Sequence, residues 1–259
     1  MADLKRQIYN LLPSFAQDTA KTAFNNYKHG EFVGDFFDSD GEYRSYRDEI
    51  YSPVVRDDLE EANRRYQKAS GDALSARLDY DAVLDYYALV RKLRPQVVVE
   101  TGVCHGVSTL FVLLALQQNE SGQLYSIDFP FRADDSLEEF REKTFAGYGG
   151  AAIPADKDPG WILPSSVKSR WELILGKSQR ELPKLLPQLS RFGLFIHDSE
   201  HSHPCMMLEF ELAYEWLDEG GVALSDDISW NEAFQTFTDV RAPNRHGLLS
   251  TNVGYFVKE

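Results

Sequence analysis

Two short stretches of the sequence hold acidic residues and histidines in a spacing that could do chemistry. Residues 197–203 read HDSEHSH, with three histidines and two carboxylates within seven residues, and a later apolar run ends in the pair Asp226 and Asp227. Each stretch follows a short apolar segment, GLFI or VALS, that predicts a buried strand. Because Asp198, Asp226 and Asp227 then follow the ends of two successive strands, we expect three carboxylates to converge at one edge of a sheet.

The composition of this acidic cluster predicts which ion it would bind. Oxygen ligands with few nitrogens favour Mg²⁺ or Mn²⁺ over zinc. Zinc is the weaker alternative, because His197 and His201 form H-x-x-x-H without the H-E-x-x-H motif of zinc proteases. A further alternative needs no metal, with one of Asp226 and Asp227 capping the following helix and the other facing solvent. The preferred prediction is a metal site at Asp198, Asp226 and Asp227.

A glycine-containing turn follows another buried strand earlier in the chain. Residues 97–109 read VVVETGVCHGVST, in which the β-branched run without polar alternation is typical of a parallel strand covered on both faces. Glu100 ends this strand, where open α/β sheets bind ligands. Gly102 and Gly106 let the backbone turn sharply and approach a ligand, and Ser108 leads into an apolar helix. The pattern predicts a ligand site at this turn, or simply a strand–turn–helix packing element.

Two further strand ends extend this candidate ligand site. Residues 123–129 predict a second strand ending in Asp128, which follows the glycine turn at the spacing of an acid that binds ribose hydroxyls. Residues 171–175 predict a third strand, and Ser178 just after it is placed to meet a ring nitrogen or amine of an adenine. Each has an ordinary alternative, a turn aspartate for Asp128 and a helix cap for Ser178.

The amino-acid composition and net charge exclude several classes of function. The chain of 259 residues is 43% hydrophobic and carries a net charge of −14. We expect no nucleic-acid partner, because phosphate binding depends on clusters of Lys and Arg. Cys104 and Cys205 are far apart and lack metal spacing, so a disulfide framework is not supported. Without a signal-peptide core or a run of about 20 apolar residues, we expect a cytoplasmic protein with no membrane partner.

The elements around these motifs are predicted by periodicity. Residues 1–90 are predicted to form a helical N-terminal cap, and residues 91–259 the core domain. The cap is expected either to close over a substrate or to join subunits in a homo-oligomer. Residues 130–170 predict an irregular insertion. In it, Trp161 either covers a ligand ring or, as we prefer, anchors the loop to the core.

The C-terminal part of the core is predicted from its apolar runs and glycines. A helix is expected over about residues 204–218. Gly220 and Gly221 are expected to form the turn between this helix and the fifth strand. Residues 254–258 predict an edge or hairpin strand, preceded by a polar connection.

Together these motifs resemble the class I S-adenosylmethionine-dependent methyltransferases, over about residues 90–259. The resemblance is strongest at IHDSEHSH and LDEGGVALSDDISWNEAF, which look like the branch of macrolide-sugar and cephalosporin-type O-methyltransferases, with the metal-dependent catechol O-methyltransferases as more distant relatives. It implies an α/β fold, with a Rossmann-like, doubly wound, mostly parallel seven-stranded sheet. It also implies S-adenosylmethionine as the cofactor and a divalent metal.

The resemblance further implies roles for individual residues. In the catechol relatives an acid ends the fourth strand, a base lies three positions later, and a second acid followed by another ligand ends the fifth strand. Asp198, His201, Asp226 and Asp227 occupy these places, so Asp198 and His201 are the predicted catalytic residues, with His201 replacing the relatives' lysine. The segment GKSQ is similar to the family's adenine-binding G-x-S-Q, which adds Gly176 to the site.

The sequence therefore predicts an enzyme that transfers a methyl group to a hydroxyl of a small molecule, such as a sugar, a phenol or a natural product, with Mg²⁺ or Mn²⁺ assisting. A histidine with an ordinary pKa near ~6.5 can act as the base. The predicted cofactor-binding residues are Glu100, Gly102, Gly106, Ser108, Asp128, Gly176, Ser178 and Asp198.

Two rival functions stay open at this point. One is a non-catalytic scaffold that binds S-adenosylmethionine. The other is an NAD-linked oxidoreductase, which is disfavoured because the turn lacks the third glycine of G-x-G-x-x-G and Glu100 would repel a pyrophosphate.

Overall fold

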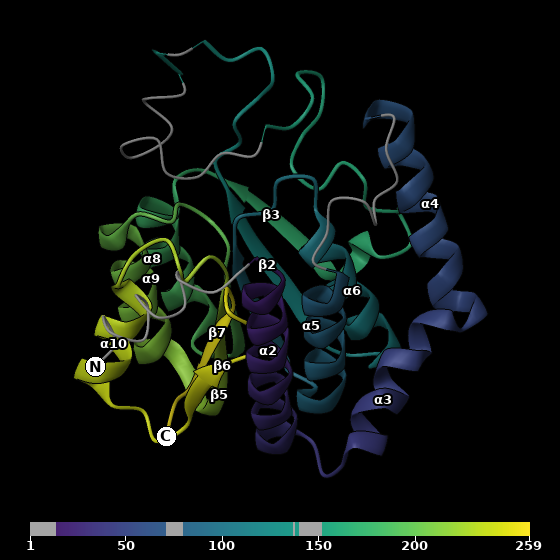
Figure 1. The fold of residues 1–259 in the computed structure, drawn as a ribbon. Helices are drawn as coiled ribbons and strands as arrows, with labels where there is room; N and C mark the ends of the chain where they lie inside the picture. The colour runs from purple at the N-terminus through teal and green to yellow at the C-terminus, as the bar shows by residue number, and fades with distance from the viewer. Residues whose placement is uncertain (1–13, 71–79, 137, 140–151) are drawn as a thin grey trace.

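A seven-stranded sheet in the order β3-β2-β1-β4-β5-β7-β6 runs through the chain, with helices on both faces (Figure 1). The computed structural model describes residues 14–70, 80–136, 138–139 and 152–259. Strands β1 to β5 pair in parallel, and β7 pairs antiparallel with β5 and β6. The strands are β1 Val97–Thr101, β2 Gln123–Asp128, β3 Trp171–Leu175, β4 Phe192–His197, β5 Leu217–Ser225, β6 His246–Leu248 and β7 Gly254–Val257. The predicted doubly wound α/β fold is confirmed.

Helices both precede the sheet and connect its strands. The α-helices are α2 Ser14–Phe36, α3 Asp40–Asp48, α4 Pro53–Ser70, α5 Tyr80–Leu93, α6 Val107–Gln118, α8 Ser178–Leu189, α9 His203–Trp216 and α10 Ala233–Arg241, with short 3₁₀ turns at Glu49–Tyr51 and Lys168–Arg170. Within the described ranges, no helix combines the length and the apolar character needed to cross a membrane.

The sheet separates two hydrophobic layers because successive side chains of a strand point to opposite faces. Val98 of β1 belongs to the cluster with α2, α5 and α6, whereas its neighbour Val99 belongs to the cluster with α8, α9 and α10. Both valines are fully buried. This two-sided burial is the reason why β1 reads as a continuous apolar run.

The N-terminal helices pack on the same side as α6. Phe32 and Phe36 of α2 contact Tyr255 of β7, with ring centroids 5.6 and 5.2 Å apart. The Tyr255 hydroxyl donates to Asp35 at 2.5 Å. Helix α2 thus covers the antiparallel end of the sheet, far from the edge strand β3 (Figure 1).

The C-terminal third differs from prediction in two places, the start of β5 and the presence of α10. Strand β5 already begins at Leu217 and contains both glycines, because a bulge in its pairing with β4 and the positive φ of Gly220 (79°) let the strand continue. Strand β7 lies between β5 and β6, so of the two predicted alternatives, an edge or a hairpin strand, the hairpin strand is the one observed. Helix α10 was not predicted, although its buried residues follow helical spacing, namely Ala233, Phe234, Phe237 and Thr238.

The predicted insertion is described only in part, and residues 137 and 140–151 lie outside the described residues. Its later segment packs on the body of the protein. Trp161 stacks on Tyr66 of α4, with centroids 6.1 Å apart and an interplanar angle of 18°, and donates from Nε1 to His105 Nδ1 at 2.9 Å. Trp161 therefore anchors the loop, as preferred from the sequence.

Candidate active site

A cavity of about 450 Å³ opens at the carboxyl ends of the five parallel strands. This volume is typical of a small-molecule site. The strand order divides its lining in two. We call the part after β2 and β3 the β2–β3 end, lined by Asp128, Phe129, Gly176, Lys177 and Ser178 among others. The part after β4 and β5 is the β4–β5 end, lined by Asp198, Ser199, Glu200, His201, Asp227 and Trp230.

The glycine turn lies between these two ends and requires its glycines. Gly102 has φ +86°, and a Cβ added there would lie 1.9 Å from the Asp198 carbonyl oxygen. Gly106 has φ +93°, and its Cβ would lie 2.7 Å from Gly160 Cα. Gly102 leaves room for the loop after β4 and lines the cavity. Gly106 leaves room for Gly160 of the insertion and is not among the lining residues.

Glu100 lies beneath the turn instead of in the cavity. Its carboxylate is fully buried and accepts hydrogen bonds from Ser108 and Thr109 of α6, both at 2.9 Å, and from Ser126 at 2.7 Å. Burial raises the pKa of Glu100 to about 7, although these hydroxyl donors oppose the rise. The two side chains bond to each other and neither lines the cavity, so the cofactor contacts predicted for Glu100 and Ser108 gain no support from the structure.

Asp128 lines the cavity and also holds the turn. Its Oδ2 accepts from the backbone N–H groups of Val103 at 2.7 Å and Cys104 at 2.9 Å. Burial raises the pKa of Asp128, against the lowering effect of these two amides. The predicted strand-end aspartate thus fixes the loop between β1 and α6 while presenting its carboxylate to the cavity.

Gly176 and Ser178 both line the cavity, after β3. Ser178 is the first residue of α8 and does not cap it, because the residue at the cap position is Lys177, whose side chain makes no capping bond. The Lys177 ammonium instead lies 5.6 Å from the centre of the Phe129 ring. The β2–β3 end thus presents a hydroxyl, a carboxylate and an aromatic ring that is 43% exposed.

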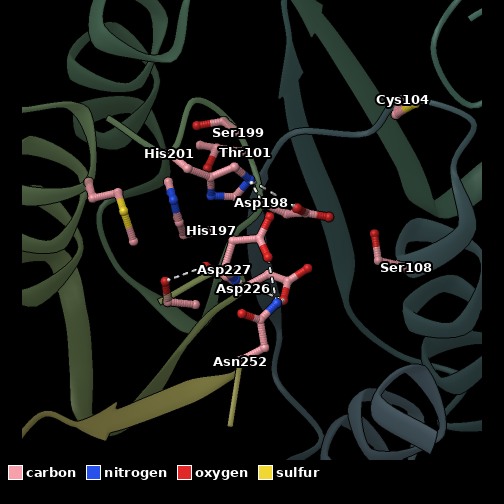
Figure 2. A network of polar contacts seen from close by, with 12 residues as sticks. Thr101, Cys104, Ser108, His197, Asp198, Ser199, His201, Asp226, Asp227 and Asn252 are labelled. Atoms are coloured by element: carbon pink, nitrogen blue, oxygen red, sulfur yellow. Dashed lines mark hydrogen bonds and ion pairs between the residues drawn. The ribbon is translucent and has the colours of Figure 1, made fainter. Parts of the chain in front are cut away.

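The three predicted strand-end acids come together at the β4–β5 end (Figure 2). Burial raises the pKa of Asp198 well above its usual value, and the carboxylates of Asp226, Glu100 and Asp227 raise it further. Asn252 donates to both Asp226 and Asp227. Neither of these two acids caps α10, whose cap position is Glu232.

His201 lies against these acids. Its Nε2 is 3.7 Å from Asp198 Oδ1 and 3.5 Å from Asp227 Oδ2, while its Nδ1 is buried without a hydrogen-bond partner. Burial lowers the pKa of His201 to about 4, His197 lowers it further, and Asp227 opposes this. The imidazole is therefore neutral at pH 7, and a weaker base than the sequence predicted.

A buried network behind the cavity was not predicted. Glu209 of α9 accepts hydrogen bonds from Thr101 at 2.5 Å and Ser199 at 2.8 Å, and pairs with His197 Nδ1 at 2.7 Å. Although burial raises it, the pKa of Glu209 is lowered to about 2, first by His197. This pairing fixes the His197 ring, whose Nε2 is buried without a hydrogen-bond partner. The available signal was a charged residue within the apolar sequence of α9.

The acids suit a divalent cation by type, since carboxylate oxygens are its preferred ligands. Their mutual repulsion, which adds to the effect of burial on the pKa of Asp198, is what a cation would relieve. As the side chains lie, however, no group of three His, Cys, Asp or Glu residues in the described part of the chain is arranged to hold an ion. The residues present fit a metal in chemistry and location without forming a closed shell.

Trp230 and Phe129 are among the cavity residues that sequence reasoning missed. Trp230 is 48% exposed and its ring centroid lies 5.2 Å from that of His201. A backbone turn places it, with Trp230 N donating to the Asp227 carbonyl at 3.0 Å. Phe129 occupies the opposite end. An aromatic residue just after a strand-end acid was the only signal for either.

Comparison with known proteins shows the family of the chain. Residues 99–228, half of the chain, match the family described as "Methyltransferase domain". No curated protein sequence matches the chain. Among solved structures, a candidate caffeoyl-CoA O-methyltransferase from Staphylococcus aureus is 10% identical, covers 77% of this chain and 91% of its own, and has a TM-score of 0.50.

Two further solved structures are similar at lower scores. An O-methyltransferase from Bacillus cereus, in complex with SAH, is 14% identical over 83% of this chain and 97% of its own, with a TM-score of 0.48. An SAH-bound methyltransferase from Podospora anserina is 12% identical over 86% and 96%, with a TM-score of 0.48.

At 10% identity the Staphylococcus aureus structure speaks to the fold alone, and the family match carries the assignment. The match spans the glycine turn, the strand-end acids and the His201 loop, and ends just after Asp227. The chain therefore belongs to the methyltransferase domain family, the class I enzymes that use S-adenosylmethionine.

Proposed function

We propose that this protein is an O-methyltransferase that transfers the methyl group of S-adenosylmethionine to a hydroxyl of a small molecule, with a divalent metal ion, Mg²⁺ or Mn²⁺, assisting. The single observation that carries the proposal is the division of the cavity. One end offers groups suited to a nucleoside, and the other gathers three carboxylates and a neutral imidazole.

The β2–β3 end would bind the adenosine part of the cofactor. The carboxylate of Asp128 uses Oδ2 for two backbone amides, which leaves Oδ1 to accept hydrogen bonds from ribose hydroxyls. Ser178 offers a hydroxyl to the adenine edge, and the exposed ring of Phe129 offers an apolar face for stacking. Gly176, where a Cβ would lie 2.6 Å from the Glu181 side chain, keeps this slot open.

The β4–β5 end would activate the acceptor. S-adenosylmethionine supplies a methyl carbon that is already activated by its sulfonium, so the protein mainly aligns the acceptor and makes it nucleophilic. His201 Nε2, neutral and directed at the acids, accepts the proton of the acceptor hydroxyl. The acceptor oxygen then forms the new bond to the methyl carbon as the carbon–sulfur bond breaks, which leaves S-adenosylhomocysteine.

Asp198, Asp226 and Asp227 would hold the divalent ion. When bound, the ion lowers the pKa of an acceptor hydroxyl. This matters because a histidine whose pKa is about 4 is too weak a base to deprotonate an ordinary alcohol unaided.

The test is methyl transfer in vitro. The purified protein is incubated with S-adenosylmethionine labelled in the methyl group, MgCl₂ and a panel of phenols, catechols and sugars, and both labelled product and S-adenosylhomocysteine are measured. We expect product with at least one hydroxylated acceptor. Tight cofactor binding by calorimetry without transfer to any acceptor would instead favour the scaffold hypothesis, and binding of NAD alone would favour the oxidoreductase.

A further inference from the structure

The charges at the β4–β5 end bear on which acceptor the cavity takes. Asp198, Glu200 and Asp227 line this end, and Asp226 lies just behind them. Of the described residues that line the cavity, the one with a fixed positive charge is Lys177. It follows β3, three strands from β4 in the sheet, which corresponds to roughly 14 Å across the strands.

Lys177 is also occupied at its own end of the cavity. Its ammonium lies over the Phe129 ring, at the strand end that we assign to adenosine. An acceptor bound next to His201 would therefore meet carboxylates without a nearby Lys or Arg among the described lining residues. Burying an anionic group in such a place is costly, because its charge loses water and gains no cation other than the ion, whose charge the three aspartates already balance.

Glu200 keeps the β4–β5 end negatively charged even when Asp198 and Asp227 bind the metal ion. Its Oε1 accepts from Ser202 at 2.6 Å and its Oε2 from Gln179 at 3.2 Å. Both partners are neutral, so the negative charge of Glu200 is oriented but not cancelled. The remaining acids, Asp198 and Asp227, are those we assign to the metal.

Trp230 supplies a face for a ring. Nearly half of this large side chain is exposed, and it is braced from both sides of its loop. Its amide donates to Asp227, while the preceding Ser229 donates to Asn252 Oδ1 at 2.6 Å. A held, exposed indole beside carboxylates is the combination that binds a flat or cationic group, because the ring face attracts positive charge.

Building on the proposed function, we propose that the β4–β5 end selects a ring-bearing acceptor that is neutral or positively charged, with its ring on Trp230, and rejects acceptors that carry a carboxylate or phosphate. The selection rests on the position of the charges and on the exposed indole. It narrows the substrate class and separates this site from one built for an acyl-CoA, whose phosphates would need cationic partners.

The first test measures the charge at Trp230 directly and needs no turnover. Tryptophan fluorescence is quenched with caesium, iodide and neutral acrylamide, in the wild type and in Trp230→Phe, with S-adenosylhomocysteine and MgCl₂ present throughout. The difference between the two proteins isolates Trp230 from the other three tryptophans. Each quenching constant is divided by that of free N-acetyltryptophanamide.

We expect the normalised constant for caesium to exceed that for iodide by about threefold or more at low salt, since clefts of one sign of charge concentrate counter-ions. Glu200→Gln should bring the ratio toward one, while Glu60→Gln, which removes the same charge from the exposed surface of α4, should not. Iodide quenching Trp230 as well as caesium does would overturn the proposal.

The second test uses acceptors with the same ring and different charge. Dopamine, 4-methylcatechol and 3,4-dihydroxybenzoate are compared for binding to the protein loaded with S-adenosylhomocysteine and for methyl transfer. We expect the first two to bind about tenfold or more tightly than the benzoate. Equal use of the benzoate would refute the charge selection and leave the O-methyltransferase function standing. Absence of transfer to every acceptor would refute that function, and the quenching ratio would still decide the charge selection.

Discussion

Acidic residues have opposite surroundings at the glycine turn and at the β4–β5 end of the cavity. At and beneath the glycine turn, Glu100 has three hydroxyl donors and Asp128 two backbone amides. At the β4–β5 end, Asp198, Asp226 and Asp227 crowd together, and two of them share the amide of Asn252. Acids that accept hydrogen bonds from nearby protein donors stabilise the fold. Acids that crowd against each other are suited to bind a ligand.

The largest expected effect concerns the crowded acids at the β4–β5 end. Asp227→Asn should lower kcat for methyl transfer by about 10²- to 10³-fold, because it removes one charge from the acidic cluster that would hold the ion. Asparagine tolerates the positive φ of this position (50°), so the fold should be kept. S-adenosylhomocysteine affinity, measured by calorimetry, should stay unchanged, as should the activity of the exposed control Asp156→Asn. An unaltered kcat in Asp227→Asn would remove this acid from the reaction.

The next effect concerns the buried acid. The pKa of Glu100 is raised from 4.5 to about 7, so between these pH values the folded state holds the proton more tightly than the unfolded state. The free energy of unfolding should therefore fall as pH rises from 4.5 through 7, by about 3 kcal/mol at most from this group. Glu100→Gln has no proton to lose and should lack this component.

Urea unfolding of the wild type and Glu100→Gln at several pH values measures this difference. The variant should gain stability relative to the wild type as pH rises. A difference between the two proteins that is constant with pH would mean that Glu100 is not a buried acid of raised pKa.

A smaller effect is expected for Asp128, which both fixes the glycine turn and faces the cavity. Asp128→Ala should weaken binding of S-adenosylmethionine by about thirtyfold, because it removes the ribose acceptor and also releases the amides of Val103 and Cys104. Calorimetric titration measures the affinity, and Glu172→Ala on neighbouring β3 serves as the control. Wild-type affinity in a folded Asp128→Ala protein would take Asp128 out of the cofactor site.

The smallest expected effect concerns the hydrogen-bond donor that Asp226 and Asp227 share. Asn252→Ala removes the amide shared by Asp226 and Asp227, and should raise the Mg²⁺ concentration needed for half-maximal activity by about tenfold or less. A Mg²⁺ titration of the methyl-transfer rate gives this value. If the requirement is unchanged while the activity stays normal, the amide does not orient these acids toward an ion.

The fold was largely predictable because its signals are local. The runs that form β1 to β4 and the glycines of the turn are contiguous in sequence, and strand ends in a parallel sheet meet at one edge. The meeting of Asp198 with Asp226 and Asp227 followed from strand order. Strand β5 was misjudged because its bulge depends on pairing with β4, which no local pattern encodes.

The tasks of individual acids were harder to predict. A strand-end position says where Glu100 lies along β1 but not that Ser108, Thr109 and Ser126 would enclose it. In the same way, His197 and His201 look alike in sequence, yet only the first meets Glu209 of α9. Such partners are distant in sequence, so their pairing is decided by packing.

The most direct measurement of the central claim is the metal dependence of turnover. Methyl transfer from labelled S-adenosylmethionine is followed in protein treated with EDTA and then again after Mg²⁺ is added back in excess. The account predicts that chelation abolishes product formation, that Mg²⁺ restores it, and that Asp226→Asn behaves like the chelated enzyme even with Mg²⁺ present. Full turnover in EDTA, with no divalent ion detectable by elemental analysis, would contradict it.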